Sequence, residues 1–128
     1  MRAKEIAETA VTRAGQLLQG RAVDGVDAQV AAVFWYGAVD INPKHCVVWV
    51  ILRGPGSADI PPWYMVGESV RVVPGASSMK EETVLCLEAM TAEVHRAFRE
   101  QSWKWVEPSV GFESDERVQA GGGWQYFK

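Results

Sequence analysis

Apolar residues near the start of the chain recur at steps of three and four, the spacing of one face of an α-helix. Gly20 stands where such a helix would end. The pattern predicts a helix over about 2–19. Its apolar stripe is thin and rich in alanine, so the helix can lie close to its support: Ala3, Ile6, Ala7, Ala10, Ala14, Leu17 and Leu18.

Two continuous apolar runs follow, QVAAVFWYGAV over 29–39 and CVVWVIL over 46–52. Both are short and rich in β-branched and aromatic residues, which favours strands over helices. Asn42-Pro43 between them is a turn signal. We therefore expect the two runs to form a hairpin.

A symmetric five-residue connection in this hairpin would pair Val39 with His45, and therefore Trp35 with Trp49 across the ladder. Both faces of the hairpin would be apolar, so both need cover. Either one helix packs on each face, or both helices pack on one face. In the second case a loop, a second copy of the chain or a ligand covers the other face.

The next segments are less regular. The Gly- and Pro-rich stretch 54–62 predicts a loop, and 64–73 predicts a third strand or a short hairpin hinged at Gly67. Ser78 and Glu81 have the spacing of a helix-capping box. An apolar stripe with helical period follows them, which predicts a second long helix over about 79–101.

The tail begins with an extended segment, 103–114, in which Pro108 predicts an interrupted or edge strand. Ser114 is a suitable cap for a short helix over 115–120, and Gly121 is a suitable end for that helix.

These elements define an α+β fold in a single compact domain over 1–128, with two long helices packed on a central, mainly antiparallel sheet. Val and Ile together number 22 against five Leu, which supports a sheet at the centre. A length of 128 residues suits one domain with a sizeable core.

Charge and composition exclude several classes of function. The net charge is −3 and no stripe of Lys and Arg is present, so we expect no nucleic-acid partner. The sequence contains no uncharged apolar stretch long enough to predict a membrane span. The N-terminus carries charges where a signal peptide would be apolar, so we expect a cytoplasmic protein. Cys46 and Cys86 are then free buried thiols.

No motif predicts catalysis or a cofactor. The chain lacks the close Cys and His spacings of a metal site. Residues 67–71 begin like a nucleophile elbow, but Arg71 stands where the last Gly belongs. The glycines at 121–123 lack the Lys of a phosphate-binding loop. We therefore expect no catalytic residue, no metal and no cofactor.

Aromatic residues beside Pro, Gly and charged positions predict instead a non-enzymatic interaction protein with an aromatic, mildly acidic surface. The partner would be a protein, either a basic one or a second copy of the chain. The residues expected on this surface are Trp63, Tyr64, Trp103, Trp105, Glu113, Trp124 and Tyr126.

The alternative is a small enzyme or ligand carrier. Its pocket would lie between the sheet and the C-terminal tail, with Asp40, His45 or Glu113 as titrating groups.

Four short stretches resemble a small family of bacterial proteins: 34–37 (FWYG), 40–45 (DINPKH), 111–114 (GFES) and 122–124 (GGW). The resemblance covers a minority of the chain. It implies an association with toxin–immunity systems, and it implies no activity, cofactor or functional residue.

Overall fold

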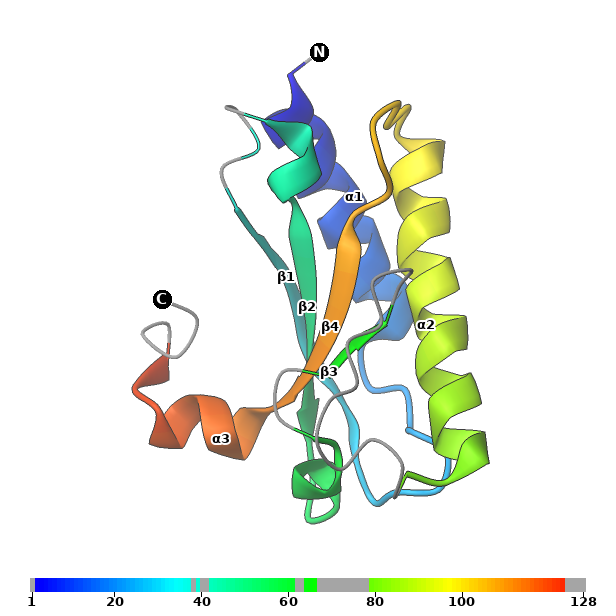
Figure 1. The fold of residues 1–128 in the computed structure, drawn as a ribbon, viewed down its shortest axis with the longest axis vertical. Coiled ribbons are helices and arrows are strands. Elements are labelled where there is room, and N and C mark those ends of the chain that lie inside the picture. Colours follow the sequence, from blue (N-terminus) through cyan, green and yellow to red (C-terminus); the bar gives the residue numbers. More distant parts are fainter. Residues whose placement is uncertain (1, 38, 40–41, 62–63, 67–78, 124–128) are drawn as a thin grey trace.

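The core of the fold is a four-stranded sheet with the order β1-β2-β4-β3 (Figure 1). The structure, a computed structural model, describes residues 2–37, 39, 42–61, 64–66 and 79–123. β1 pairs antiparallel with β2, β2 parallel with β4, and β4 antiparallel with β3. The predicted α+β class is confirmed, and the sheet is mixed. The strands are β1 (Gln29–Tyr36), β2 (Val47–Arg53), β3 (Tyr64–Val66) and β4 (Ser109–Ser114).

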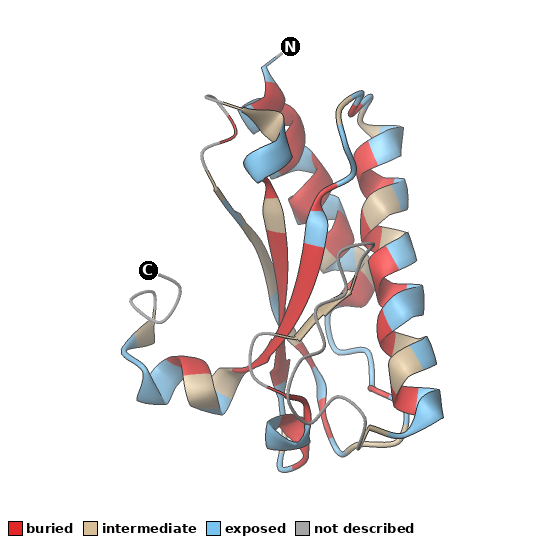
Figure 2. Ribbon diagram, in the orientation of Figure 1, coloured by how far each residue is buried: buried red, intermediate tan, exposed pale blue. Residues whose placement is uncertain are grey.

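Both long helices pack on the same face of this sheet, which decides between the two arrangements left open by the sequence. The helix α1 (Ala3–Leu18) lies against β1, and α2 (Glu81–Glu100) lies beside α1 and against β3 and β4 (Figure 1). Figure 2 shows the buried stripe of each helix turned inward. The alanines of α1 are fully or nearly fully buried, so the thin stripe does bring the helix close to its neighbours.

The opposite face of the sheet carries a smaller apolar cluster. Trp49 and Ile51 of β2 are each 5% exposed and form this cluster with Val118. Val118 belongs to a short helix, α3 (Asp115–Ala120), which follows β4 and contacts the end of the sheet. This cluster shields the β2 half of the second face. On β1, Ala32 and Tyr36 are exposed and Phe34 is half-buried, so the predicted cover of this face is wrong for β1.

The hairpin is confirmed, but the predicted register is wrong by one residue. Trp35 lies opposite Val48, and Phe34 lies opposite Trp49. β1 ends at Tyr36, and the connection contains a 3-10 helix, η1 (Pro43–His45). This helix makes the connection longer and asymmetric, so a symmetric five-residue turn does not describe it.

A glycine and an asparagine shape this connection. The Asn42 side chain accepts a hydrogen bond from the Lys44 amide at 3.1 Å, as its turn-forming character predicts. Gly37 has φ +125° and lies against the backbone of His45. No side chain fits at Gly37, because a Cβ there would overlap the His45 carbonyl.

The predicted capping box of the second long helix is wrong. α2 begins at Glu81, with Lys80 at the capping position and no side-chain cap. Glu81 is therefore the first helical residue rather than the third, and Ser78 lies outside the described residues. Thr83 in the first turn donates a 2.6 Å hydrogen bond to the carbonyl of Asp24, which fastens this end of the helix to the loop before β1.

The tail also differs in part from prediction. Pro108 interrupts the predicted extended segment 103–114, as one alternative expected, because β4 starts directly after it; the other alternative is wrong, since β4 is an inner strand. Pro108 is tolerated because it precedes the ladder and therefore removes no donor from it. Of the predicted third strand over 64–73, the structure describes Tyr64–Val66 as β3, and 67–73 lie outside the described residues.

Candidate functional site

The predicted aromatic surface is only partly covered by the described residues. Trp63, Trp124 and Tyr126 lie outside them. Tyr64 is half-buried on β3. Burial, and after it the negative charge of Glu88, raise the pKa of the Tyr64 phenol above its ordinary value. This ring therefore lies partly inside the molecule, between the sheet edge and α2.

Trp103 is 6% exposed, so its predicted place on a binding surface is wrong. Its ring packs edge-on against Phe98 at a centroid distance of 5.0 Å, and Trp105 packs against it in turn at 4.8 Å. The Trp103 indole N–H donates to the carbonyl of Val106 at 3.0 Å. These contacts close the turn at the end of α2, and Trp105 remains half-buried beside it.

Glu113 is fully buried, so its predicted place on the same surface is also wrong. Its carboxylate accepts a hydrogen bond from the Ser114 amide at 2.7 Å and forms a 2.6 Å ion pair with Nε of Arg117. A buried carboxylate is stable only when it is paired and hydrogen-bonded in this way. The pair joins the end of β4 to α3 at i, i+4 spacing.

Arg117 extends this link to the loop after β2. Its two terminal nitrogens donate to the carbonyls of Ala58 at 3.2 Å and Ile60 at 2.5 Å. The hydroxyl of Ser114 lies at the predicted capping position of α3 but bonds the Ser57 hydroxyl at 2.8 Å instead of the helix. The whole polar cluster therefore fastens three segments together and has a structural role.

The groups expected in a catalytic pocket do not come together. Asp40 lies outside the described residues. His45 is exposed in η1, before the first residue of β2, whereas Glu113 lies opposite Ile51 near the far end of that strand. Six residues of extended strand separate these two levels by roughly 20 Å. His45 and Glu113 therefore cannot act as an acid–base pair in this fold.

A second charged cluster, which the sequence analysis did not single out, lies between α2 and the segment before β4. Nε2 of His95 donates to the carbonyl of Pro108 at 2.8 Å, since a carbonyl can only accept. Glu107 pairs with Arg99 at 2.7 Å and lies 3.5 Å from Nδ1 of His95. These contacts hold the entry to β4 against α2.

Metal binding and thiol chemistry depend on how possible ligands are grouped, and on how reactive the cysteine thiols are, in the described part of the chain. No three His, Cys, Asp or Glu residues within it are grouped so as to hold a metal ion. Both cysteines are free, as predicted, and Cys46 is buried, but Cys86 is half-buried, so its predicted burial is wrong. Burial raises the pKa of the Cys46 thiol to about 12. Because the reactive form is the thiolate, Cys46 is inert near neutral pH.

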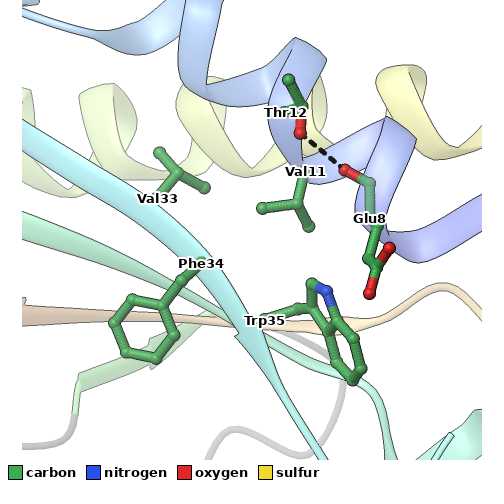
Figure 3. Close-up of a pocket in the computed structure, with 6 residues that line it drawn as sticks. All are labelled: Glu8, Val11, Thr12, Val33, Phe34 and Trp35. Atoms are coloured by element: carbon green, nitrogen blue, oxygen red, sulfur yellow. Dashed lines mark hydrogen bonds between the residues drawn. The ribbon is translucent and has the colours of Figure 1, made fainter. Parts of the chain in front are cut away.

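The surface feature that combines aromatic, apolar and acidic groups lies elsewhere, in a shallow groove between α1 and β1 (Figure 3). Its volume is about 420 Å³, and it is widely open to solvent, so it is a surface depression rather than an enclosed ligand pocket. The apolar side chains are supplied by both elements, and Glu8 extends from α1 toward the Trp35 indole ring. The lining residues are Glu8, Val11, Thr12, Val33, Phe34 and Trp35.

The groove runs along the outer edge of the sheet, because β1 is an edge strand. The first part of this edge is covered: Val30 exchanges backbone hydrogen bonds with Gly20 and Arg21. From Ala31 to Tyr36, β2 is the backbone neighbour of β1 among the described residues. Edge strands of monomeric proteins are usually protected by charges or Pro, and this stretch contains neither.

Comparisons with known proteins identify no relative: no family model, no curated protein and no solved structure matches this chain. None of the described helices has the length and apolar character needed to cross a membrane.

Proposed function

We propose that this protein is a non-enzymatic interaction protein that binds an extended segment of a protein partner along the outer edge of β1. The observation that carries the proposal is the uncharged stretch from Ala31 to Tyr36, which ends in three aromatic residues and lies at the sheet edge. An added strand would satisfy its backbone groups, and the aromatic side chains would supply contact area.

The exposed side chains along this strand support the same role. Tyr36 is 39% exposed, and Trp35 is half-buried beside the groove. Tyr and Trp are enriched where protein partners bind, because each offers a large contact area at a small cost in conformational entropy. The proposed surface combines these aromatic residues with one acidic side chain, Glu8, and it is built from residues other than those expected from the sequence.

A displayed library of random linear peptides tests the proposal. Selected peptides are synthesised, their affinity is measured by fluorescence anisotropy, and amide hydrogen exchange maps where they bind. We expect the amides of 31–36 to gain protection when peptide binds, because a strand pairs with them. Protection at β3 or α2 instead, or the absence of any binding peptide, overturns the proposal.

A pair of matched variants sharpens this test. Tyr36→Lys places a charge at the edge and is expected to weaken peptide binding roughly tenfold. Val106 is 73% exposed on the segment before β4, and Val106→Lys introduces the same charged side chain away from β1. We expect Val106→Lys to bind peptide like the parent protein. Equal weakening by both variants contradicts a site on β1.

A further inference from the structure

The groove beside β1 contains a negative charge that the described residues leave unpaired. Glu8 is exposed on α1 and forms no ion pair with any described Lys or Arg. The Thr12 hydroxyl, one turn later, donates to the backbone carbonyl of Glu8 at 2.8 Å and so is not committed to the carboxylate. A cationic group entering the groove would therefore meet an available carboxylate.

The same groove offers an aromatic ring next to this charge. The indole of Trp35 hangs from β1 on the side of the sheet that α1 covers, and Figure 3 shows it beside the Glu8 side chain. Val11 and Val33 supply apolar surface between helix and strand. A Trp face attracts cations, and apolar walls suit the aliphatic part of a Lys or Arg side chain. The chemistry of the groove thus matches a long basic side chain.

The geometry of strand addition would bring such a side chain to this place. Side chains of a strand alternate between the two faces of a sheet. Trp35 lies opposite Val48, and both belong to the face covered by the helices. A residue of an added strand that points to the same face would enter the space between α1 and the sheet edge. Its neighbours in sequence would point to the other face.

A second copy of this chain is a poorer occupant of the edge. Its own β1, QVAAVFWY, contains no basic residue. Pairing of two β1 strands would bring no basic strand residue to either Glu8, and the second α1, with two acidic and two basic residues, would add no net charge at the edge. Charge complementarity therefore favours a different partner.

We propose that the groove between α1 and β1 is a specificity pocket for one Lys or Arg side chain of an extended peptide partner. Glu8 is its counter-charge and Trp35 its aromatic platform. This inference rests on the proposed function, because it requires the partner strand to lie along β1. It adds the chemical class of the residue that the partner must carry.

The test starts from the peptides selected against the parent protein. We expect one position to be enriched in Lys or Arg, and replacement of that residue by Leu to weaken binding roughly tenfold. For the Glu8→Gln variant, we expect the ratio of the affinities of the Lys and Leu peptides to fall to about threefold or less. Glu5→Gln, one turn earlier on α1 and outside the groove, leaves the difference unchanged. Raising the salt concentration weakens the Lys peptide more than the Leu peptide.

The outcomes separate this inference from the proposed function. If peptides protect the amides of 31–36 but show no preference for Lys or Arg, the specificity pocket is wrong and the strand-binding role stands. If Glu8→Gln and Glu5→Gln reduce the preference equally, the pocket is likewise wrong. If light scattering shows a stable dimer whose β1 amides are already protected without peptide, a second copy is the occupant and the inference fails.

Discussion

The ring of Trp49 fills the space into which a side chain at Gly111 would project from the neighbouring parallel strand. The two residues are register partners, and a Cβ at Gly111 would lie 2.6 Å from Cε3 of Trp49 and 2.7 Å from the sulfur of Met65. Glycine is required at this position by close packing on the second face of the sheet. Its φ is not positive, so backbone conformation is not the reason.

Gly111→Ala is expected to lower the free energy of unfolding by about 1–3 kcal/mol, the usual cost of adding atoms to a packed site. Urea denaturation followed by tryptophan fluorescence measures it. Replacement of Trp49 by Leu in the same chain removes the ring, so Gly111→Ala is then expected to lower the free energy of unfolding by a smaller amount. The matched control is Gly15→Ala in α1, where a Cβ would lie 3.9 Å from that of Val33.

This control variant is expected to stabilise the protein by up to about 1 kcal/mol, because alanine is the better helix former. Destabilisation by Gly111→Ala that persists unchanged in the Trp49→Leu background would contradict the packing explanation.

Breaking the ion pair between Glu113 and Arg117 is expected to lower the free energy of unfolding by a large amount. Arg117→Met leaves a fully buried carboxylate without its cation, and it removes the bonds to the loop after β2. We expect a loss of about 3 kcal/mol or more. The double variant Glu113→Gln with Arg117→Met is expected to recover part of this loss, since no buried charge remains. Chemical denaturation provides the measurement.

Arg96→Met is the control for this experiment. Arg96 lies 3.8 Å from Glu93 in a pair whose arginine is more than half exposed, and its loss should change stability by less than about 0.5 kcal/mol. Similar losses of unfolding free energy for Arg96→Met and Arg117→Met would mean that the buried pair stabilises the protein no more than an exposed pair does.

Cys46 predicts a loss of stability at alkaline pH. Its pKa rises from 9.0 to about 12 on folding. Above about pH 9 the unfolded chain therefore releases a proton that the folded chain retains. The free energy of unfolding should fall by up to about 1.4 kcal/mol per pH unit in this window. Urea unfolding at a series of pH values measures the slope.

Tyr64 acts in the same direction, since its pKa is also raised. The contribution of Cys46 is therefore read from the difference between the parent protein and Cys46→Ala, in which Tyr64 is unchanged. Parallel stability curves for these two proteins would show that the thiol does not titrate differently in the folded state.

Local patterns made the helices and the hairpin predictable. The apolar periods ending at Leu18 and at Phe98 are properties of single segments, and they gave both long helices to within about two residues. The register error at Trp35 has a local cause too, because the hairpin connection folds into a 3-10 helix that apolar patterning does not reveal. Likewise, Asn42 signalled a turn but not its length.

The functional surface was less accessible to sequence reasoning because it depends on contacts between distant segments. Which strand lies at the edge is decided by the pairing of β2 with β4, about sixty residues apart in the chain. Trp35 could not be assigned to an edge before that pairing was known. The burial of Glu113 had one local signal, an arginine four residues later, at the spacing of a helical ion pair.

The insertion of β4 between β2 and β3 bears on how this protein is made. During synthesis the residues of β3 leave the ribosome well before those of β4, and β3 has no other partner in the sheet. The hairpin meanwhile leaves the second edge of Val47–Arg53 without a strand neighbour, open to solvent or to a chaperone. The sheet is completed only when β4 has been synthesised, so β2 stays without its second neighbour while residues 54–108 are added to the nascent chain.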